Sequence, residues 1–315
     1  MEIEDVDVDR PHAHEVVVRT AATGVCHSDV HHVEWADNID IPRILGHEPA
    51  GVVEAVGELV THVRPGDHVI ACLSVFCGTC EYCLTGHPNL CDKTRTARRP
   101  DEPPRLSQGG TRINTLANIG SFAEKMLLHE NAVVKIREDM PLDRAALLGC
   151  GVITGMGAVL RTARIEPNST VAVFGAGGVG LSAIQGARIA GARQIIAVDT
   201  RESKLEIARR LGATHTVDAS KGNVVDAVKA AASSAGGVDY SFEAIGVPAV
   251  IEQAFLSLRP GGTATVIGIA QDHERITLDP RLLLQERKLQ GSSMGSNRFR
   301  VDLPNYIDQI GRAHV

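Results

Sequence analysis

The chain has 315 residues and a formal charge of −6, from 32 Lys and Arg against 38 Asp and Glu. That length suffices for two ordinary domains with sizeable cores. Hydrophobic residues make up 43% and charged residues 22%, which excludes a disordered or fibrous chain. The acidic balance argues against nucleic acid or an anionic membrane as the main partner.

No targeting or membrane-spanning segment is predicted. The sequence begins with the acidic segment Met1–Asp5, where a secretory or mitochondrial signal would be basic. The longest uncharged stretch, Pro167–Ala187, is long enough to span a bilayer, but its five glycines and polar residues favour a strand, a loop and a helix. We therefore expect a cytoplasmic protein that binds neither membrane nor nucleic acid.

The first part of the chain is predicted to form short strands joined by turns. Strands are expected at Glu15–Thr20, Gly51–Val56 and His68–Ala71, the last of them after the turn Arg64–Asp67.

Four of the seven cysteines lie in one short segment. Cys77, Cys80 and Cys83 are separated by two residues each, and Cys91 follows eight positions later. Four thiolates at this spacing can surround one zinc ion, and such a site is structural because it has no open position. A redox pair or chance clustering is the less specific interpretation. An iron–sulfur cluster also takes four thiolates and remains open on sequence alone.

The three other cysteines are isolated. Cys72 ends an apolar segment and is expected to be a small buried hydrophobic residue. Cys26 has polar and histidine neighbours, whereas Cys150 lies between two glycines that allow backbone or ligand to approach closely. Spacing alone does not indicate whether these two share a site, or which of 13 histidines would join them.

A polar loop rich in arginine and proline follows Cys91. We expect this loop to be a solvated surface. Its arginines are Arg95, Arg98, Arg99, Arg105 and Arg112.

From about Val152 the pattern changes to strands that alternate with helices, which predicts parallel βαβ units and a doubly wound sheet. The expected strands are Val171–Phe174, Gln194–Val198, a segment near His215–Val217, Val238–Phe242 and Thr263–Ile269. The expected helices are Leu181–Ala190, ended by Gly191, and Ser203–Leu211, Asn223–Ala232 and Ala249–Leu258.

A glycine-rich loop of the form GxGxxG follows the first of these strands directly and opens a helix. Gly175 permits the tight turn, Gly177 lets a pyrophosphate approach the backbone, and Gly180 allows close packing of helix and strand. The pyrophosphate would lie at the helix N-terminus, where free amides favour negative charge. The dinucleotide-binding residues predicted from this motif are Gly175, Gly177, Gly178, Val179 and Gly180.

An acidic residue, Asp199, ends the next strand, 19 positions after Gly180. Its carboxylate can accept hydrogen bonds from the adenosine ribose and would repel a 2′-phosphate, so NAD is favoured over NADP. Arg201 and Lys204 follow closely and could weaken that preference.

These motifs together closely resemble the zinc-dependent medium-chain alcohol dehydrogenases, with a class III-like branch as the nearest pattern. The resemblance implies an α/β protein with a GroES-like β catalytic domain (1–151, with a structural-zinc lobe at 77–91), a Rossmann doubly wound NAD-binding domain (152–293) and a return to the first domain from 294. The matching segments are Gly24–Asp29, Gly46–Glu48, the four-cysteine segment, Gly149–Gly151 and the glycine loop.

The resemblance also implies a ligand set that spacing could not assign. Cys26, His47 and Cys150 correspond to the ligands of a catalytic zinc, so that two zinc ions and NAD are expected per chain. Taken alone, His47 would be interpreted as a turn residue. Asp29 would orient the His47 ring, and Glu48 would lie behind the metal.

The resemblance implies oxidation of an alcohol to a carbonyl compound with hydride transfer to NAD. Zinc with three protein ligands keeps a position for substrate and lowers the pKa of the alcohol. Ser28 and His31 correspond to a relay that carries the proton to solvent; without the resemblance they would be a turn residue and a surface residue. Thr154 resembles a residue beside the nicotinamide, and Lys204 one near the adenosine ribose.

The substrate is predicted less directly. Arg95 resembles an anion anchor in the branch that oxidises the glutathione adduct of formaldehyde. That branch usually has Thr at the position of Ser28 and Tyr at that of His31, so we favour a primary or aromatic alcohol, with thiol-dependent formaldehyde oxidation (glutathione or mycothiol) as the alternative.

Three other classes of protein account for fewer of these residues. A zinc-stabilised binding module without catalysis would leave Cys26, His47, Cys150 and the glycine loop without a purpose. Zinc-free quinone reductases typically lack the cysteines, and polyol dehydrogenases commonly have Glu at the position of Cys150.

Both ends of the sequence differ from the family pattern. The family's opening hairpin is expected before Met1, and its return to the catalytic domain is expected to extend past Val315. Residues 310–315 resemble a translated sequencing adapter, so we expect a truncated chain with a foreign tail. The intact parent is expected to form a homo-oligomer, either a dimer or a tetramer.

Overall fold

The computed structural model describes residues 2–34, 41–233 and 236–312, and the chain divides into two compact units. The first comprises Met1–Cys150 and Arg298–Val315, and the second comprises Gly151–Asn297. The domain boundaries predicted from the sequence, after residues 151 and 293, remain predictions. Of the predicted foreign tail, 310–312 end the last helix and 313–315 lie outside the described residues.

The first unit is built mainly of β-strands. Its largest sheet has the order β10-β5-β4-β2-β9 with antiparallel neighbours: β10 (Val133–Lys135), β5 (His68–Ala71), β4 (Glu48–Val56), β2 (Glu15–Gly24) and β9 (Lys125–His129). The smaller sheets contain β1 (Asp7–Val8), β6 (Leu106–Gln108) and β7 (Thr111–Arg112), and the pair β3 (Arg43–Ile44) and β8 (Asn114–Thr115). The three strands predicted in this region are confirmed, and β2 and β4 are longer than predicted.

Three consecutive β-branched residues, Val16, Val17 and Val18, favour a strand at the start of β2, where the residues on both faces are buried. Val16 and Val18 point into the core of the first unit, where they pack with Met126 and Leu128 of β9 and Val53 of β4. The sequence analysis missed β9 and β10 because each is a short apolar run, for which periodicity is a weak signal.

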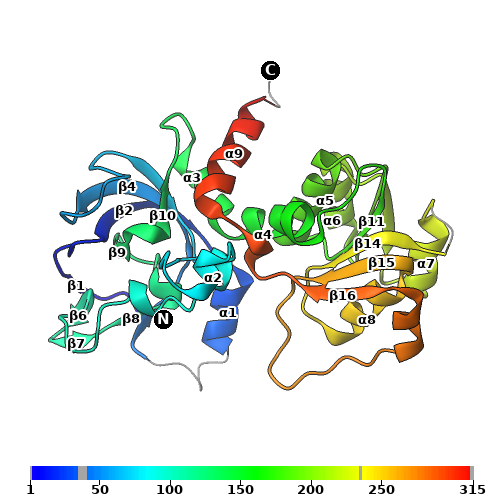
Figure 1. Ribbon diagram of the computed structural model, residues 1–315, viewed down its shortest axis with the longest axis horizontal. Coiled ribbons are helices and arrows are strands. Elements are labelled where there is room, and N and C mark those ends of the chain that lie inside the picture. The colour runs from blue at the N-terminus through cyan, green and yellow to red at the C-terminus, as the bar shows by residue number, and fades with distance from the viewer. Residues whose placement is uncertain (1, 35–40, 234–235, 313–315) are drawn as a thin grey trace. The chain divides into compact units, whose positions relative to one another are not determined.

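Short helices connect and cover the strands of the first unit (Figure 1). They include α1 (His27–Glu34), α2 (Glu81–Leu84), α3 (Leu142–Ala145), a 3-10 helix (Ala146–Gly149) and α9 (Phe299–Arg312). Although α9 is distant in sequence, it contacts β10, and Phe299 packs edge-on against Phe76 at 6.0 Å between ring centroids.

The second unit contains a six-stranded parallel sheet with helices on both faces (Figure 1). Its order is β13 (His215–Asp218), β12 (Gln194–Asp199), β11 (Thr170–Phe174), β14 (Val238–Glu243), β15 (Leu258–Val266) and β16 (Lys288–Gly291). The helices are α4 (Gly151–Gly157), a π-helix (Ala158–Ala163), α5 (Gly178–Ile189), α6 (Glu202–Leu211), α7 (Val224–Ala231), α8 (Pro248–Leu256) and the 3-10 helices Pro280–Gln285 and Met294–Ser296.

The two faces of this sheet have separate cores because side chains alternate along each strand. Val171 and Val173 of β11 pack with α5 and α6, whereas Ala172 and Phe174 pack with α7 and α8. All five residues of β11 are buried, as is typical of a central strand of a parallel sheet.

Several predicted element limits in the second unit were wrong. Helix α5 begins at Gly178 rather than Leu181, because the last glycines of the loop already form its first turn. Strand β15 ends at Val266, so 267–269 lie outside it, and its start at Leu258 follows the end of α8 at Leu256. The other predicted strands and helices are present within two residues of their predicted limits.

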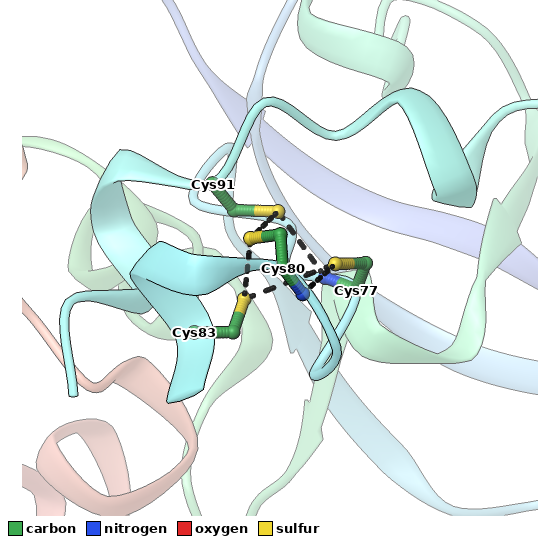
Figure 2. A group of neighbouring side chains, drawn as sticks. All are labelled: Cys77, Cys80, Cys83 and Cys91. Atoms are coloured by element: carbon green, nitrogen blue, oxygen red, sulfur yellow. Dashed lines mark hydrogen bonds between the residues drawn. The ribbon is translucent and has the colours of Figure 1, made fainter. Parts of the chain in front are cut away.

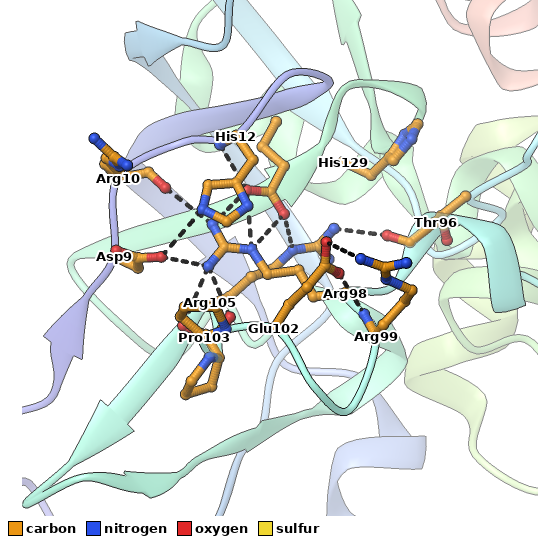
Figure 3. Close-up of polar contacts among 12 residues, drawn as sticks. Asp9, Arg10, His12, Thr96, Arg98, Arg99, Glu102, Pro103, Arg105 and His129 are labelled. Carbon is orange, nitrogen blue, oxygen red and sulfur yellow. Dashed lines mark hydrogen bonds and ion pairs between the residues drawn. The ribbon is translucent and has the colours of Figure 1, made fainter.

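The arginine-rich loop after Cys91 is not wholly a solvated surface, which corrects the prediction for two of its residues. The Arg98 side chain is only 4% exposed and donates hydrogen bonds to the carboxylates of Glu15, at 2.6 Å, and Asp9 (Figure 3). Arg105 Nε donates to Glu15 at 2.7 Å. Although burial opposes it, hydrogen bonds from Arg98, the His12 amide and Arg105 lower the pKa of Glu15 to about 2. The remaining arginines, Arg95, Arg99 and Arg112, are exposed as predicted.

Among the described residues, no single helix is both long and apolar enough to cross a membrane. One pair of consecutive helices, Leu142–Gly149 and Gly151–Ala163, passes that test by length and composition.

Candidate functional site

Four potential metal ligands from distant parts of the sequence meet in the first unit. One ligand atom from each of Cys26, His47, Glu48 and Cys150 lies within 4.8 Å of the others. His47, Glu48 and Cys150 are buried and Cys26 is partly buried. The structure therefore brings together the three residues predicted as ligands of a catalytic zinc.

The strand pairing explains this convergence. Gly24 at the end of β2 lies opposite Glu48 at the start of β4, so Cys26, just after β2, meets His47, just before β4. Cys150 follows the 3-10 helix Ala146–Gly149, which lies close to the end of β5. A Cβ at Gly149 would lie 2.6 Å from the Ala71 carbonyl oxygen, so only glycine permits this approach.

Asp29 organises the site from the first turn of α1. Its Oδ2 accepts the Cys26 amide at 3.0 Å, and its Oδ1 accepts the Gly46 amide at 3.0 Å. Oδ1 also lies 3.2 Å from Nδ1 of His47. The carboxylate thus fixes both chain segments and orients the ring with Nε2 toward the sulfurs.

The spacing of the donor atoms fits a zinc ion. His47 Nε2 lies 3.5 Å from Cys150 Sγ. A tetrahedral ion with Zn–S of about 2.3 Å and Zn–N of about 2.05 Å separates those two atoms by about 3.6 Å. Two sulfurs and one imidazole are also the ligand types that zinc prefers.

The pKa shifts within the cluster also fit a bound cation. A hydrogen bond with Cys150 outweighs burial and, with His47 and Ser28, lowers the pKa of Cys26 to about 3. For His47, burial is outweighed by Asp29 and Cys26, which raise its pKa to about 9. The hydrogen bond with Cys26, followed by burial, raises the pKa of Cys150. Burial and the Cys26 charge raise the pKa of Glu48 to about 7. A divalent cation bound among these groups would favour deprotonated thiols and a neutral imidazole.

Ser28 and His31, the predicted proton relay, lie on α1 next to this cluster. Ser28 Oγ is 3.4 Å from His47 Nε2. His31 is three residues further along the helix, which places it on the same face as Ser28. The His31 ring packs edge-on against His27 with 4.8 Å between centroids.

The second group of metal ligands is the four-cysteine lobe (Figure 2), whose Sγ atoms also lie within 4.8 Å of one another. Cys80 Sγ lies 3.5 Å from that of Cys83 and 3.7 Å from that of Cys91, and Cys77 Sγ lies 4.0 Å from that of Cys83. These distances surround the value of about 3.8 Å expected for four sulfurs at about 2.3 Å from one zinc ion. They are far above the disulfide length of about 2.0 Å.

Backbone amides donate hydrogen bonds to two of the four sulfurs in the lobe. The Cys80 amide donates to Cys77 Sγ at 3.2 Å, and the Lys93 amide donates to Cys91 Sγ at 3.3 Å. Against the effect of burial, the amides of Thr79 and Cys80 lower the pKa of Cys77 to about 6, whereas burial and the neighbouring sulfurs raise the pKa of Cys83 and Cys91. The lobe fits a tetrahedral thiolate-bound ion. Cys72 is fully buried outside both groups, and burial raises the pKa of its thiol to about 11.

The predicted dinucleotide loop has the required backbone in the second unit. Gly175 has φ +93°, and a Cβ at Gly180 would lie 1.7 Å from the Gly175 carbonyl oxygen. Gly177 is the N-cap of α5, and a Cβ there would meet no described heavy atom within 4 Å. Gly178 and Val179 form the first turn of α5. The open glycines, and the free amides that begin the helix, fit a pyrophosphate.

Three further predicted cofactor residues also lie in the second unit. Asp199, at the end of β12, accepts the Ala176 amide at 2.8 Å and the Arg201 amide at 3.0 Å. Lys204 Nζ lies 3.7 Å from the Asp199 carboxylate. Thr154 is buried in α4, and its Oγ1 donates to Met294 Sδ at 3.4 Å.

The sequence analysis missed two residues beside these sites. Glu243 ends strand β14 next to the strand that leads into the glycine loop. Ile245 lies against Gly175, because a Cβ on that glycine would be 2.6 Å from Ile245 Cγ1. An acidic residue just past a predicted buried strand was the available signal for Glu243.

A GroES-like β unit with a buried sulfur–imidazole centre and a parallel-sheet unit with a dinucleotide loop are features of metal-dependent dehydrogenases. The family model described as "Alcohol dehydrogenase GroES-like domain" matches residues 12–138, and "Zinc-binding dehydrogenase" matches residues 178–311.

Individual relatives match nearly the whole chain. The "Alcohol dehydrogenase class-3" of Zea mays is 39% identical over 322 residues, which cover 99% of this chain and 84% of the maize protein. Among solved structures, the alcohol dehydrogenase zinc-binding domain protein from Burkholderia ambifaria matches with a TM-score of 0.93 at 35% identity and covers 99% of this chain and 85% of its own. The benzyl alcohol dehydrogenase from Acinetobacter calcoaceticus matches with a TM-score of 0.92 at 33% identity and covers 99% and 86%.

The chain therefore belongs to the zinc-dependent medium-chain alcohol dehydrogenases, a family of NAD-dependent enzymes. This confirms the predicted family, the predicted cofactors zinc and NAD, and the predicted fold class of a GroES-like β domain with a Rossmann domain.

Proposed function

We propose that this enzyme oxidises a primary or aromatic alcohol to the aldehyde with hydride transfer to NAD. The observation that carries the proposal is the convergence of Cys26, His47 and Cys150 at zinc-ligand spacing. Zinc bound there supplies Lewis acidity that lowers the pKa of an alcohol, and bound NAD supplies the hydride acceptor. Cys77, Cys80, Cys83 and Cys91 hold a structural zinc.

The chain's own residues orient the catalytic site and move the proton. Asp29 holds the His47 ring through Nδ1. Glu48 has a carboxylate oxygen within 4.8 Å of the three ligand atoms and is assigned to the side of the metal away from the substrate. Ser28 Oγ, beside His47 Nε2, takes up the proton of the substrate hydroxyl as it releases its own hydroxyl proton, and His31 on the same helix face carries that proton toward solvent.

NAD is proposed to bind with its pyrophosphate at the loop Gly175–Gly180 and its ribose near Asp199 and Lys204. The Asp199 carboxylate already touches the loop through the Ala176 amide, and its charge disfavours a 2′-phosphate. Thr154 is assigned to the nicotinamide side.

The preference for a primary or aromatic alcohol rests on Ser28 and His31 and is supported by the similarity to a benzyl alcohol dehydrogenase. The test is NAD reduction with ethanol and with benzyl alcohol, with and without glutathione or mycothiol. Turnover without added thiol is expected. An absolute requirement for either thiol would contradict the proposal.

A second candidate, oxidation of a thiol adduct of formaldehyde, is favoured by Arg95 and the class-3 relatives. Here Arg95 is exposed, and its Nη1 donates to Thr79 Oγ1 in the four-cysteine lobe at 2.9 Å. If Arg95 binds the acidic part of such an adduct, Arg95→Ala raises KM for the adduct but not for benzyl alcohol. Arg99→Ala, an exposed arginine of the same loop, is the matched control.

The predicted homo-oligomer has a candidate surface on the second unit. β16 is an edge strand of the six-stranded sheet, and the neighbouring 3-10 helix Pro280–Gln285 exposes Leu283 (49%) and Leu284 (86%). Unpaired edges and exposed leucines favour association. If this surface pairs two copies, Leu284→Glu yields a monomer in light scattering.

A further inference from the structure

A buried carboxyl group lies at the carboxyl edge of the parallel sheet, and the proposed reaction does not use it. Glu243 is the last residue of β14, pairs with Phe174 of β11 and is 0% exposed. Acidic side chains are rarely buried completely without an ion pair, and no cation pairs with this one in the described part of the chain. This edge is where open parallel sheets bind ligands.

One oxygen of Glu243 holds the turn that follows β14. Oε1 accepts the Ile245 amide at 2.8 Å and the Gly246 amide at 2.7 Å. The other oxygen, Oε2, is buried and has no hydrogen-bond partner among the described residues. The carboxyl group therefore serves mainly as a fixed acceptor for two backbone amides.

The turn has little room to move. Gly246 has φ +88°, and a Cβ there would lie 2.3 Å from the Ile269 carbonyl oxygen. On the other side, the Ile245 side chain occupies the space next to Gly175, the first glycine of the dinucleotide loop. A shift of the two amides held by Glu243 would therefore move Ile245 relative to that loop.

We propose that Glu243 is a positioning residue for the coenzyme: its acceptor oxygen holds Ile245 against the loop Gly175–Gly180, so that this loop is preformed before NAD binds. The inference rests on the proposed function, which places NAD at the loop.

Substitutions of Glu243 can distinguish the role of its acceptor oxygen from the role of its negative charge. Burial raises the pKa of its carboxyl, although the amides of Gly246 and Ile245 act in the opposite direction. A neutral acid keeps its acceptor oxygen, so glutamine, which has an acceptor at the same reach, should replace it. Aspartate keeps the acid but falls short of the amides, and methionine keeps the volume without an acceptor.

The test measures NAD affinity of the zinc-loaded protein by calorimetry for Glu243→Gln, Glu243→Asp and Glu243→Met. The Gln variant should bind NAD within about threefold of wild type, whereas the Asp and Met variants should bind about tenfold or more weakly, as expected when buried amides lose their acceptor. At saturating NAD, kcat should change by less than about twofold, because the reacting groups are untouched. In the NAD-free protein, amide hydrogen exchange at Ile245 and Gly246 should be faster in the Asp and Met variants only.

Ser241→Ala is the matched control. Ser241 is buried on the same strand and face, and its Oγ donates to the Ala254 carbonyl at 2.8 Å, away from the loop. This variant should lower the melting temperature and leave the NAD affinity unchanged. If Ser241→Ala lost as much NAD affinity as Glu243→Met, the loss would reflect lower stability of the unit in general. That result would overturn the inference.

Two other results would also overturn it. One is wild-type NAD affinity in the folded Asp and Met variants, and the other is a Gln variant as weak as the Met variant, which would make charge rather than position decisive. In both cases the wild-type protein binds NAD and the proposed function stands. A folded, zinc-loaded wild-type protein that binds no NAD would instead contradict the proposed function itself.

Discussion

The first unit holds two groups of metal ligands that differ in how the chain assembles them. The four-cysteine lobe comes from one segment, 77–91, is partly exposed and contains only thiols. The site around His47 is mostly buried, mixes sulfur, imidazole and carboxylate, and draws on segments as far apart as Cys26 and Cys150. The lobe can form locally around its ion, whereas the buried site exists only when the sheet β10-β5-β4-β2-β9 is paired.

This difference separates the roles of the two ions. Four thiolates complete a tetrahedral shell, and the binding energy of such an ion is folding energy. Two thiols and one imidazole leave a coordination position, which is the requirement for catalysis. Changes at one group should therefore affect turnover, and changes at the other should affect stability.

The largest expected effect is at the buried site. Cys26→Ala or His47→Ala should lower kcat/KM by about a thousandfold or more, since Lewis-acid stabilisation of several kcal/mol is lost. Zinc content should fall from two ions to one, while the folded structure persists. Cys72→Ala, at a buried thiol outside both groups, is the control and should keep both ions and most of the activity. Full turnover in the His47→Ala variant would contradict the assignment of catalysis to the buried group.

The four-cysteine lobe should show the opposite pattern. Cys83→Ser should lower the free energy of unfolding by about 3 kcal/mol or more, because the ion that organises the lobe binds poorly. Thermal unfolding and zinc content measure both effects. Turnover per remaining folded molecule should stay within a few fold of wild type. A stable variant without activity would show that the lobe takes part in catalysis.

The ion-pair network around Glu15 provides a second test of stability in the first unit, because it anchors the loop that follows Cys91. Glu15→Gln should cost about 3 kcal/mol, the typical effect of removing one partner from a buried pair. Because the folded pKa of Glu15 is about 2, below the unfolded value of 4.5, its contribution is present above pH 4.5 and is lost as pH falls toward 2. Denaturant unfolding at pH 7 and pH 3 tests this.

The control for Glu15 is a carboxylate of the same unit with more exposed ion-pair partners. Glu54 lies 2.7 Å from Lys125 and 3.6 Å from Arg19, and Glu54→Gln should cost less than about 1 kcal/mol. Equal losses from the two variants would mean that burial of the Glu15 network contributes nothing.

The smallest expected effect concerns the orientation of His47. Asp29→Asn keeps the shape but weakens the hold on Nδ1, and such changes behind a metal ligand cost about 10- to 100-fold in affinity or activity. Zinc competition with a chelator should release the ion at the buried site first, and the lobe should be unaffected. If Asp29→Asn released zinc from both groups at the wild-type rate, Asp29 would have no role in holding His47.

The sequence alone identified the four cysteines that the structure brings together in the lobe, because they are close in sequence and their spacing is typical of metal ligands. It also predicted the alternating strands and helices of the second unit, whose patterns are likewise local. The convergence of Cys26, His47 and Cys150 could not come from spacing and needed the family resemblance, since it depends on the register between β2 and β4. The burial of Arg98 was missed because its partner, Glu15, is 83 positions away, and no local pattern records that pair.

The most direct test of the central claim is anomalous diffraction at the zinc absorption edge from crystals of this protein. Two peaks are predicted. One lies about 2.3 Å from the sulfurs of Cys26 and Cys150 and about 2.0–2.1 Å from His47 Nε2, and the other lies at the centre of the four-cysteine lobe. A single peak in the lobe, with the buried site free of zinc in an active enzyme, would contradict the account.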